Sequence, residues 1–433
     1  MSVATPHAPA VRVDAATLAS ALAALHARTT KVVGWGSGSV FDYFQGLHPV
    51  RLDYLVDSDA TRWGSSRRGV AIHAPQRLLA EVEATTLVVI YSSAWPAIQQ
   101  RLSGLGRFLA IPASALFADA ATHARLAHLD VLGAQPPARR SPTSRDAIVV
   151  QGPVVPDMTV RVLRALSALH ASNRIVLSSW TGTDAALLDE VRDYVDEVVL
   201  SDAPATAGVQ NRNYQIVSTR AGIARAMAGG ATTILKTRTD MAVLAPAIFD
   251  QARWWLARTG SDASRANGLS GRLLVPASYT RKYLLYHPSD MVMLGAADDM
   301  ARFWSAPLDP REGDLLASGW LQQPLASVNL AGNPAESYLG LAFCRALGRP
   351  VEGSLRDSWA FYRDLFAVVD NDWFDLLWLK NLSIPDAALR SGVRQTIGQQ
   401  FWTRLQLHDA ALEAELAAVD PTSLSLGALA GAA

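Results

Sequence analysis

Three charged residues close an apolar, strand-like run at residues 233–240. Lys236 and Arg238 are two residues apart, so a strand places them on one face, and Asp240 continues the same alternation. An acid at the carboxyl end of a parallel strand lies at the crevice where open α/β sheets bind ligands. There Asp240 could hold a divalent metal through its oxygens, while Lys236 or Arg238 could neutralise a phosphate. The simpler alternative is an ion cluster at a strand end.

Two further groups of polar residues lie at predicted element ends. Gln151 and Gly152 follow a predicted strand. Asn211 and Gln215 lie on one face of a predicted helix, and Arg212 lies on the neighbouring face. Amide and guanidinium groups at the start of a helix that follows a strand suit a nucleobase or a phosphate. The alternatives are an ordinary turn and a solvated helix face.

A glycine-rich turn near the N-terminus has the physical logic of a dinucleotide site. Gly34, Gly36 and Gly38 follow a predicted strand and precede a predicted helix, and Asp57 ends the next strand. Glycines let the backbone approach a phosphate, the helix start offers free N–H groups, and an acid can bind ribose hydroxyls. The spacing is G-x-G-x-G and not the full G-x-G-x-x-G, so a tight strand-to-helix turn without a ligand is the alternative.

The segments around these residues alternate strand-like and helix-like patterns, which is typical of an α/β fold with parallel strands. In the first part, strands are predicted at 31–34, 51–57, 69–73, 87–91 and 108–111, and helices at 15–27 and 95–105. This part predicts a Rossmann-like domain over residues 13–135, which either binds a nucleotide or serves as a scaffold.

A stretch rich in Pro, Ser and Arg, residues 133–145, predicts a linker. After it, strands are predicted at 147–151, 174–180, 197–202 and 233–240, and helices at 160–170, 185–194 and 211–228. Residues 272–294 show a mixed pattern with apolar, strand-like runs, and the rest of the chain to residue 412 is mainly helical. The predicted fold class is therefore α/β, with an N-terminal Rossmann-like parallel sheet and a second α/β domain over residues 146–412 that ends in a helical extension.

The composition excludes several classes of protein. The 433 residues include 39 Lys and Arg and 39 Asp and Glu, so no net charge attracts nucleic acid. A single cysteine, Cys344, excludes a disulfide framework and a thiolate zinc site. No apolar run approaches the ~20 residues of a membrane helix, and the N-terminus lacks a signal-peptide pattern. We expect no nucleic-acid partner, no transmembrane segment and a cytoplasmic location.

Six short segments resemble one family by their order and spacing. They are residues 149–153 (VVQGP), 177–180 (LSSW), 211–219 (NRNYQIVST), 235–240 (LKTRTD), 288–291 (PSDM) and 336–339 (ESYL). Together they resemble the WavE-type lipopolysaccharide-synthesis family, a divergent GT-A-like glycosyltransferase group, over about residues 148–352. The resemblance implies a GT-A-like second domain. That domain would take a nucleotide-sugar donor and pass its sugar to a hydroxyl of a lipopolysaccharide, O-antigen or capsule glycan acceptor.

The resemblance also implies roles for individual residues. Asp240 would hold a divalent metal, Mn²⁺ or Mg²⁺, at the diphosphate, and the polar residues named above would contact the donor. GT-A enzymes usually carry Asp-x-Asp, whereas Arg238 stands at the first position here. We therefore expect Arg238 or Lys236 to supply part of the neutralising charge.

An inverting transfer needs a base that takes the proton of the acceptor hydroxyl. In inverting GT-A enzymes, an acid at a helix start about a hundred residues after the metal-binding strand has this role, so the resemblance assigns it to Glu336. Asp290 is the second choice, as a contact for the acceptor. The alternative for Glu336 is stabilisation of the helix dipole, which is common in a first turn.

Two other functions remain open. An NAD-linked sugar-nucleotide oxidoreductase would use the first domain, and a non-catalytic scaffold would bind another enzyme of envelope-glycan synthesis. Arg139, Arg140 and Arg145 form a local basic patch. That patch predicts peripheral contact with the inner face of the cytoplasmic membrane.

Overall fold

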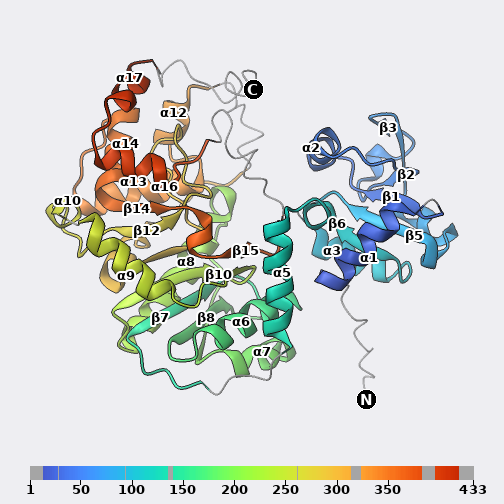
Figure 1. The fold of residues 1–433 in the computed structure, drawn as a ribbon, viewed down its shortest axis with the longest axis horizontal. Helices are drawn as coiled ribbons and strands as arrows, with labels where there is room; N and C mark the ends of the chain where they lie inside the picture. Colours follow the sequence, from blue (N-terminus) through green and yellow to red (C-terminus); the bar gives the residue numbers. More distant parts are fainter. Residues whose placement is uncertain are drawn as a thin grey trace. The chain divides into compact units, whose positions relative to one another are not determined.

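The chain forms two compact units. Unit 1 comprises Met1–Ala134 and Leu377–Pro385, and unit 2 comprises Gln135–Leu376 and Asp386–Ala433. The computed structural model describes residues 13–27, 29–92, 94–134, 140–260, 262–313, 323–382 and 395–418. Figure 1 shows both units coloured along the sequence. The return of residues 377–382 to unit 1 was not indicated by the sequence pattern.

Unit 1 alternates strands and helices, and it contains two helices, at residues 113–116 and 120–133, that the sequence pattern did not predict. Its strands are β1 (Lys31–Trp35), β2 (Tyr54–Val56), β3 (Ser66–Arg67), β4 (Val70–His73), β5 (Thr86–Ile90) and β6 (Leu109–Pro112). Its helices are α1 (Ala15–His26), α2 (Ser39–Leu47), α3 (Trp95–Ser103), α4 (Ala113–Leu116) and α5 (Ala120–Gly133). Asp14 caps α1, because its carboxylate accepts a hydrogen bond from the N–H of Thr17 at 2.8 Å.

The sheet of unit 1 has the strand order β3-β4-β2-β1-β5-β6. Every pairing from β4 to β6 is parallel, and only the short β3 runs antiparallel to its neighbour. The chain moves outward from β1 through β2 to β4 and then crosses to β5 on the other side. This reversal places a crevice at the carboxyl ends of β1 and β5, where doubly wound sheets bind ligands.

Among the residues that the structure describes, unit 2 has more strands than unit 1, and seven of them form one mixed sheet. Its strands are β7 (Asp146–Gln151), β8 (Arg174–Trp180), β9 (Glu197–Ser201), β10 (Thr233–Arg238), β11 (Met241–Val243), β12 (Leu273–Pro276), β13 (Met293–Ala296) and β14 (Phe366–Val369), with β15 (Leu376–Trp378) where the chain leaves the unit. Its helices are α6 (Met158–Leu169), α7 (Ala185–Val191), α8 (Arg212–Ala228), α9 (Ile248–Thr259), α10 (Asp262–Ala266), α11 (Ala297–Phe303), α12 (Leu325–Leu330), α13 (Ala335–Leu347), α14 (Leu355–Leu365), α16 (Gln399–Gln406) and α17 (Ala410–Ala418).

The seven strands of this sheet are ordered β14-β12-β13-β10-β7-β8-β9. Within it, β13 runs antiparallel to both neighbours and the other strands share one direction. All six residues of β7 are buried, as expected of a parallel strand covered on both faces. The α/β class predicted from the alternating pattern is confirmed.

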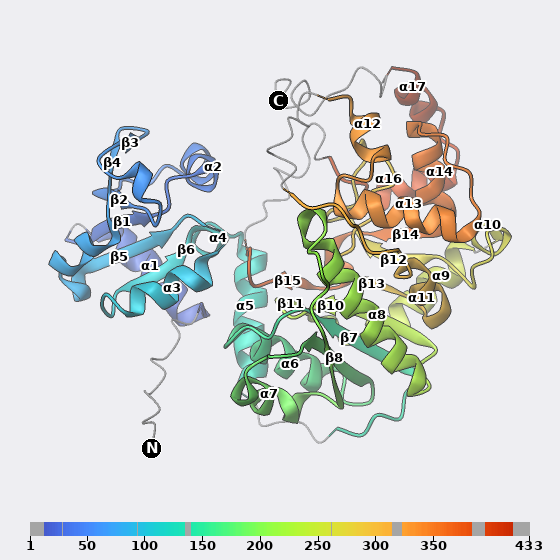
Figure 2. The same cartoon turned by 180° about the vertical axis from the view of Figure 1, so that it is seen from behind.

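Helix α8 packs across β7 and β8, as Figure 2 shows from behind. Gly222 makes this close approach feasible, because a Cβ there would lie 2.5 Å from a methyl group of Val149 and 3.1 Å from Cβ of Ser178. The hydroxyl of Ser178 also donates to the carbonyl of Ser218 at 2.7 Å. A glycine and a pair of small polar residues therefore fix the helix onto the sheet.

Two predicted strands are shorter in the structure. The strand predicted at 233–240 ends at Arg238, and Asp240 lies in the turn that leads into β11. The strand predicted at 51–57 is reduced to β2. Asp240 bonds locally, to Arg238. Asp53 and Asp57, which flank β2, instead accept hydrogen bonds from backbone N–H groups 21 and 20 residues earlier in the chain. Within the described ranges, no helix is long and apolar enough to cross a bilayer.

We predict that Gly36→Val destabilises unit 1 alone. Gly36 has a φ of +103°, and a Cβ would lie 2.7 Å from the carbonyl oxygen of Tyr91, the residue after β5. Strain and overpacking together should cost about 2–4 kcal/mol. Urea unfolding read by hydrogen exchange of β1 and β7 peptides measures the two units separately.

Gly64→Ala is the matched control for this variant. Gly64 also has a positive φ, +78°, but nothing lies within 4 Å of its Cβ position. It should therefore lose only the strain contribution, about 1 kcal/mol. Equal losses of protection in β1 and β7 would show that the effect is not confined to unit 1.

Candidate functional site

The predicted residues of unit 2 converge because several chain segments meet at one edge of its sheet. Strands β7, β10 and β12 end at this edge, and the antiparallel β13 begins there. Gln151 and Arg238 are direct cross-strand partners, and the N–H of Thr239 donates to the carbonyl of Gln151 at 3.0 Å. The loop that precedes β13 carries Asp290 to the same edge.

Gln151 and Gly152 join β7 to its neighbours. The side-chain carbonyl of Gln151 accepts a hydrogen bond from the hydroxyl of Ser218 on α8 at 2.9 Å. Gly152 has a φ of +130°, and a Cβ there would lie 2.7 Å from the hydroxyl of Thr239. The glycine is therefore required by the close approach of two strand ends, whether or not a donor also binds there.

Arg238 and Asp240 form a two-pronged ion pair across the turn. The Nε and Nη2 groups of Arg238 each donate to one carboxylate oxygen of Asp240 at 2.8 Å. Burial alone would lower the pKa of Arg238, but the charge and hydrogen bonds of Asp240 outweigh it and raise the pKa. Arg238 therefore stays a cation, and 27% of its side chain is exposed, against 9% for Asp240.

The predicted role of Asp240 as a metal ligand competes with its ion pair to Arg238. Both of its oxygens accept hydrogen bonds from Arg238, which stands where a second carboxylate would be needed. Across the part of the chain that the structure describes, no three His, Cys, Asp or Glu side chains gather as metal ligands. Metal binding by Asp240 stays a prediction, and the geometry favours neutralisation of charge by Arg238.

Lys236 is wholly buried below this edge. Its ammonium group donates to the carbonyl oxygens of Asp290 and Met291, the latter at 3.2 Å, and lies 4.8 Å from the ring centre of Trp304. Burial lowers the pKa of Lys236. Its position shows it holding the loop before β13, which leaves Arg238 as the more accessible cation of the two.

Glu336 and Asp290, the two candidate acids, lie in one electrostatic neighbourhood. Burial raises the pKa of Asp290, and the nearby charge of Glu336 raises it further. Burial likewise raises the pKa of Glu336. Gln215 joins them, because its amide donates to the carbonyl of Asp290 at 3.5 Å.

His287 gives Glu336 a partner for its proton. Its Nε2 lies 3.4 Å from Oε2 of Glu336, and its Nδ1 lies 3.0 Å from the carbonyl oxygen of Tyr279. A carbonyl can only accept, so Nδ1 carries the hydrogen and Nε2 faces the carboxyl group. Burial, reinforced by Arg281, lowers the pKa of His287 to about 4. A single proton between Nε2 and Oε2 therefore satisfies both groups.

Arg212 does not face the sheet edge. It is fully buried, its Nη1 lies 3.4 Å from Asp309, and it donates to the carbonyls of Gly332 and Asn333. Burial lowers its pKa to about 10. These bonds hold the turn that precedes α13, so the guanidinium positions Glu336 and is not free for the donor.

Asn211 stands apart from the cluster. It begins α8 in a left-handed conformation, with a φ of +60°, and its side chain is exposed. Its neighbour Gln210 accepts a hydrogen bond from the N–H of Ala335 at 2.9 Å, which brings the starts of α8 and α13 together. The structure thus assigns contacts between helices, and not a sheet-edge position, to this segment.

Tyr279 and Arg281 belong to the cluster but were not predicted. The guanidinium carbon of Arg281 lies 4.8 Å from the ring centre of Tyr279. Burial raises the pKa of Glu336, and the positive charge of Arg281 offsets part of this rise. They lie in an irregular loop after β12, where no periodicity or motif marks them. His287 was visible only as a lone histidine.

The glycines of unit 1 separate into two kinds. Gly34 and Gly36 are required by packing, because a Cβ would lie 2.5 Å from a methyl group of Leu55 or 2.7 Å from the carbonyl of Tyr91. Gly36 also lines a cavity at the crevice between β1 and β5, together with Gly38 and Asp57, but the Cβ position of Gly38 is not blocked by packing.

One arginine of the predicted basic patch is used within the protein. The side chain of Arg140 is 8% exposed, pairs with Asp196 at 2.6 Å and also donates to the carbonyl of Asn173. Arg145 is exposed, and Arg139 lies outside the described residues. Arg140 therefore contributes no free charge for contact with a membrane surface.

Comparison with known families identifies the middle of the chain. Residues 147–328 match the family model described as WavE lipopolysaccharide synthesis, which confirms the resemblance for this segment. Neither a curated protein nor a solved structure matches the chain. The match implies involvement in lipopolysaccharide synthesis. Glu336 lies beyond it, so the role of Glu336 rests on its own surroundings.

We predict that Arg212→Ala destabilises unit 2 by about 3–5 kcal/mol, because it leaves Asp309 buried with one partner fewer. Urea unfolding measured on unit 2 peptides tests this. Arg225→Ala is the control, since Arg225 pairs with Glu197 at the surface and 56% of its side chain is exposed. That variant should lose about 0–1 kcal/mol. Similar losses in the two variants would contradict a positioning role for Arg212.

We also predict a pH-dependent gain of stability in Glu336→Gln. Below the ordinary value of 4.5 the carboxyl is protonated whether folded or unfolded. Between that value and its raised folded pKa only the unfolded chain ionises, so the folded protein loses stability as the pH rises. Glutamine lacks this loss. The Tm of the variant relative to wild type should therefore be higher at pH 8 than at pH 5, by at least ~2 °C.

The exposed Glu352→Gln is the control for this measurement. A Tm difference for Glu336→Gln that is the same at both pH values would mean that burial does not hold a proton on Glu336.

Proposed function

We propose, from the membership of residues 147–328 in the WavE lipopolysaccharide synthesis family, that the protein is a glycosyltransferase with a GT-A-like second domain. It would move a sugar from a nucleotide-sugar donor to a hydroxyl of a lipopolysaccharide, O-antigen or capsule glycan. The observation that carries the proposal is the cluster at the edge of the unit 2 sheet. It joins a partly exposed cation, Arg238, to a buried acid, Asp290, and a partly buried one, Glu336.

The donor requires positive charge at its diphosphate, because the leaving nucleoside diphosphate gains negative charge as the sugar departs. Arg238 meets this need in the proposed reaction. Asp240 holds its guanidinium in a fixed orientation at the strand end. A planar guanidinium also matches two phosphate oxygens better than an ammonium group does. No step of the proposal requires a metal.

Glu336 is the proposed base. As the acceptor oxygen forms its bond to the anomeric carbon, its proton passes to Glu336, and the bond from that carbon to the diphosphate oxygen breaks. A carboxyl group whose pKa is raised is a stronger base, once ionised, than an ordinary glutamate. His287 lies 3.4 Å from Glu336 and can share the proton afterwards. Asp290 is the proposed contact for the acceptor.

The alternative of an NAD-linked oxidoreductase requires an acid in unit 1 that is free to bind ribose hydroxyls. Asp57 accepts four hydrogen bonds, from Ser37 N, Ser37 Oγ, Asp59 N and Arg62 Nη1. Three of these bonds fall on Oδ2 and one on Oδ1, so most of the acceptor capacity of the carboxylate, about four lone-pair sites, is used within the protein. The observation favours the transferase over the oxidoreductase.

The test is a screen of nucleotide sugars by thermal shift, with and without Mn²⁺, followed by assay of nucleoside diphosphate release with an acceptor glycan. Glu336→Gln should lower kcat about 10²–10⁴-fold with little change in the KM of the donor. Glu352→Gln should keep the wild-type rate. Full activity in Glu336→Gln would remove the proposed base.

Arg238→Ala should raise the KM of the donor and lower kcat, and turnover should persist in EDTA. A rate that EDTA abolishes and Mn²⁺ restores would assign the neutralising charge to a metal. Binding of a donor without turnover would favour the non-catalytic scaffold.

A further inference from the structure

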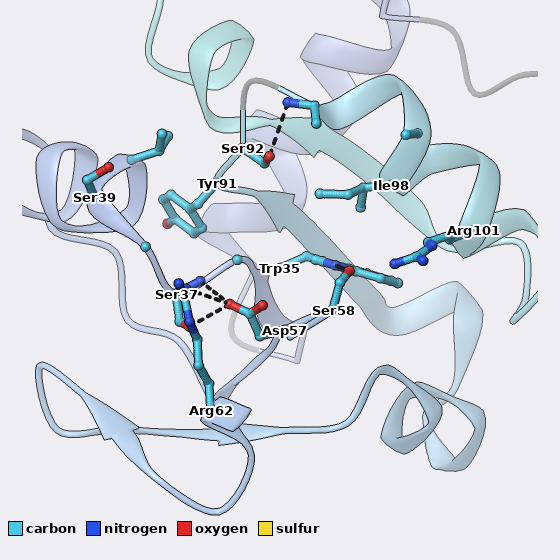
Figure 3. Close-up of a pocket in the computed structure, with 15 residues that line it drawn as sticks. Trp35, Ser37, Ser39, Asp57, Ser58, Arg62, Tyr91, Ser92, Ile98 and Arg101 are labelled. Atoms are coloured by element: carbon cyan, nitrogen blue, oxygen red, sulfur yellow. Dashed lines mark hydrogen bonds and ion pairs between the residues drawn. The ribbon is translucent and has the colours of Figure 1, made fainter. Parts of the chain in front are cut away.

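A cavity of about 410 Å³ lies in unit 1 and shares no residue with the cluster used above. It opens at the carboxyl ends of β1, β2 and β5, where the strand order reverses. Figure 3 shows residues from three separate turns facing it, among them Ser37, Asp57 and Tyr91. Its volume is in the range of small-molecule sites, and its place is where doubly wound sheets bind ligands.

The start of helix α2 faces this cavity without a cap. Gly38 is the N-cap, and no side chain bonds to the first turn. Among the described residues, none accepts a hydrogen bond from the N–H groups of Gly38, Ser39 or Val40. A Cβ on Gly38 would meet only the guanidinium of Arg62, at 3.5 Å. The backbone here is therefore open to a ligand, unlike that of Gly36.

Asp57 shapes this turn. Its hydrogen bonds from the backbone and hydroxyl of Ser37, at 2.8 and 2.5 Å, hold the segment before α2. Burial would raise the pKa of Asp57, but the bonds from Ser37 and Asp59 outweigh it and lower the pKa. The carboxylate thus stays ionised and bonded to the protein, and does not present a free negative charge to the cavity.

Two arginines line the cavity on different sides (Figure 3). Arg62 lies beside the start of α2 and is shared with Asp57 and Asp59 at 3.3 and 3.2 Å. Arg101 projects from the last turn of α3 and makes no ion pair with any described residue. Between them lies an apolar wall of Trp35, Tyr91 and Ile98. This lining suits a ligand that has an anionic group at one end and a flat, weakly polar body.

We propose that this cavity binds a phosphorylated small molecule of nucleotide size. Its phosphate accepts hydrogen bonds from the N–H groups of Gly38, Ser39 and Val40. The phosphate also pairs with Arg62, and Arg101 contacts the ligand from the opposite side of the cavity. Its remaining body lies along Trp35, Tyr91 and Ile98. The shared chemistry is that of a nucleotide or a sugar phosphate. The site is independent of the transferase proposal, since it uses no residue of unit 2.

The test is hydrogen exchange of the full-length protein with UMP, AMP, glucose 1-phosphate or inorganic phosphate, each in EDTA. Bound phosphate should slow exchange in peptides covering residues 36–47, because their free N–H groups become hydrogen-bonded. Stronger protection by UMP or AMP than by glucose 1-phosphate identifies a nucleotide, and the reverse identifies a sugar phosphate.

Gly38→Val should abolish this protection while leaving the Tm close to that of wild type, since its Cβ position is open. Arg101→Ala should weaken binding at least ~10-fold, as expected for a charged hydrogen bond. The exposed Arg51→Ala, outside the lining, should bind as wild type does. No protection of residues 36–47 by any probe, or equal protection in Gly38→Val, would overturn the proposal. Protection confined to unit 2 would overturn it and leave the transferase proposal intact.

Discussion

The parallel pairing of β7 with β10 decides where chemistry can occur in unit 2. Because the two strands run in the same direction, Gln151 and Arg238 end side by side, and the chain leaves both strands at one edge. The antiparallel β13 begins at this edge, so its preceding loop adds Asp290 and His287. The close contact between Gly152 and Thr239 shows how tightly the strand ends are joined.

Burial then sets the charge of each group at this edge. Burial shifts four pKa values in the direction that favours the neutral form of the group, those of Lys236, Asp290, Glu336 and His287. Arg238 behaves differently, because Asp240 meets it with two hydrogen bonds. The cluster therefore combines groups whose neutral forms are favoured with a guanidinium that keeps its charge.

Unit 1 applies the same constraint with different residues. Its strand ends also converge, but there the carboxylate of Asp57 accepts hydrogen bonds from its own turn. The free donors are the backbone N–H groups at the start of α2. Gly36 meets the packing need of the sheet, and Gly38 leaves room in front of the helix. The two glycines look equivalent in the sequence, but each occupies its position for a different physical reason.

Local pattern was sufficient for much of the fold. Alternating apolar runs predicted the α/β class, the long helix α8 and the strand that ends near Arg238, because these depend on periodicity within one segment. The exact strand end was missed, since the pairing of Asp240 with Arg238 depends on a turn and not on hydrophobicity.

The sequence by itself determined which residues could do chemistry, since residue type and the position after a strand are local properties. The tertiary structure alone decided which of them meet. Arg212 and Asn211 are neighbours of Gln215 in the chain, yet Arg212 supports the turn before Glu336 and Asn211 stays at the surface. His287 and Glu336 are 49 positions apart (336 minus 287) and lie 3.4 Å from each other. Contacts of this kind depend on how the loops after β12 and before α13 pack, and no local pattern encodes that packing.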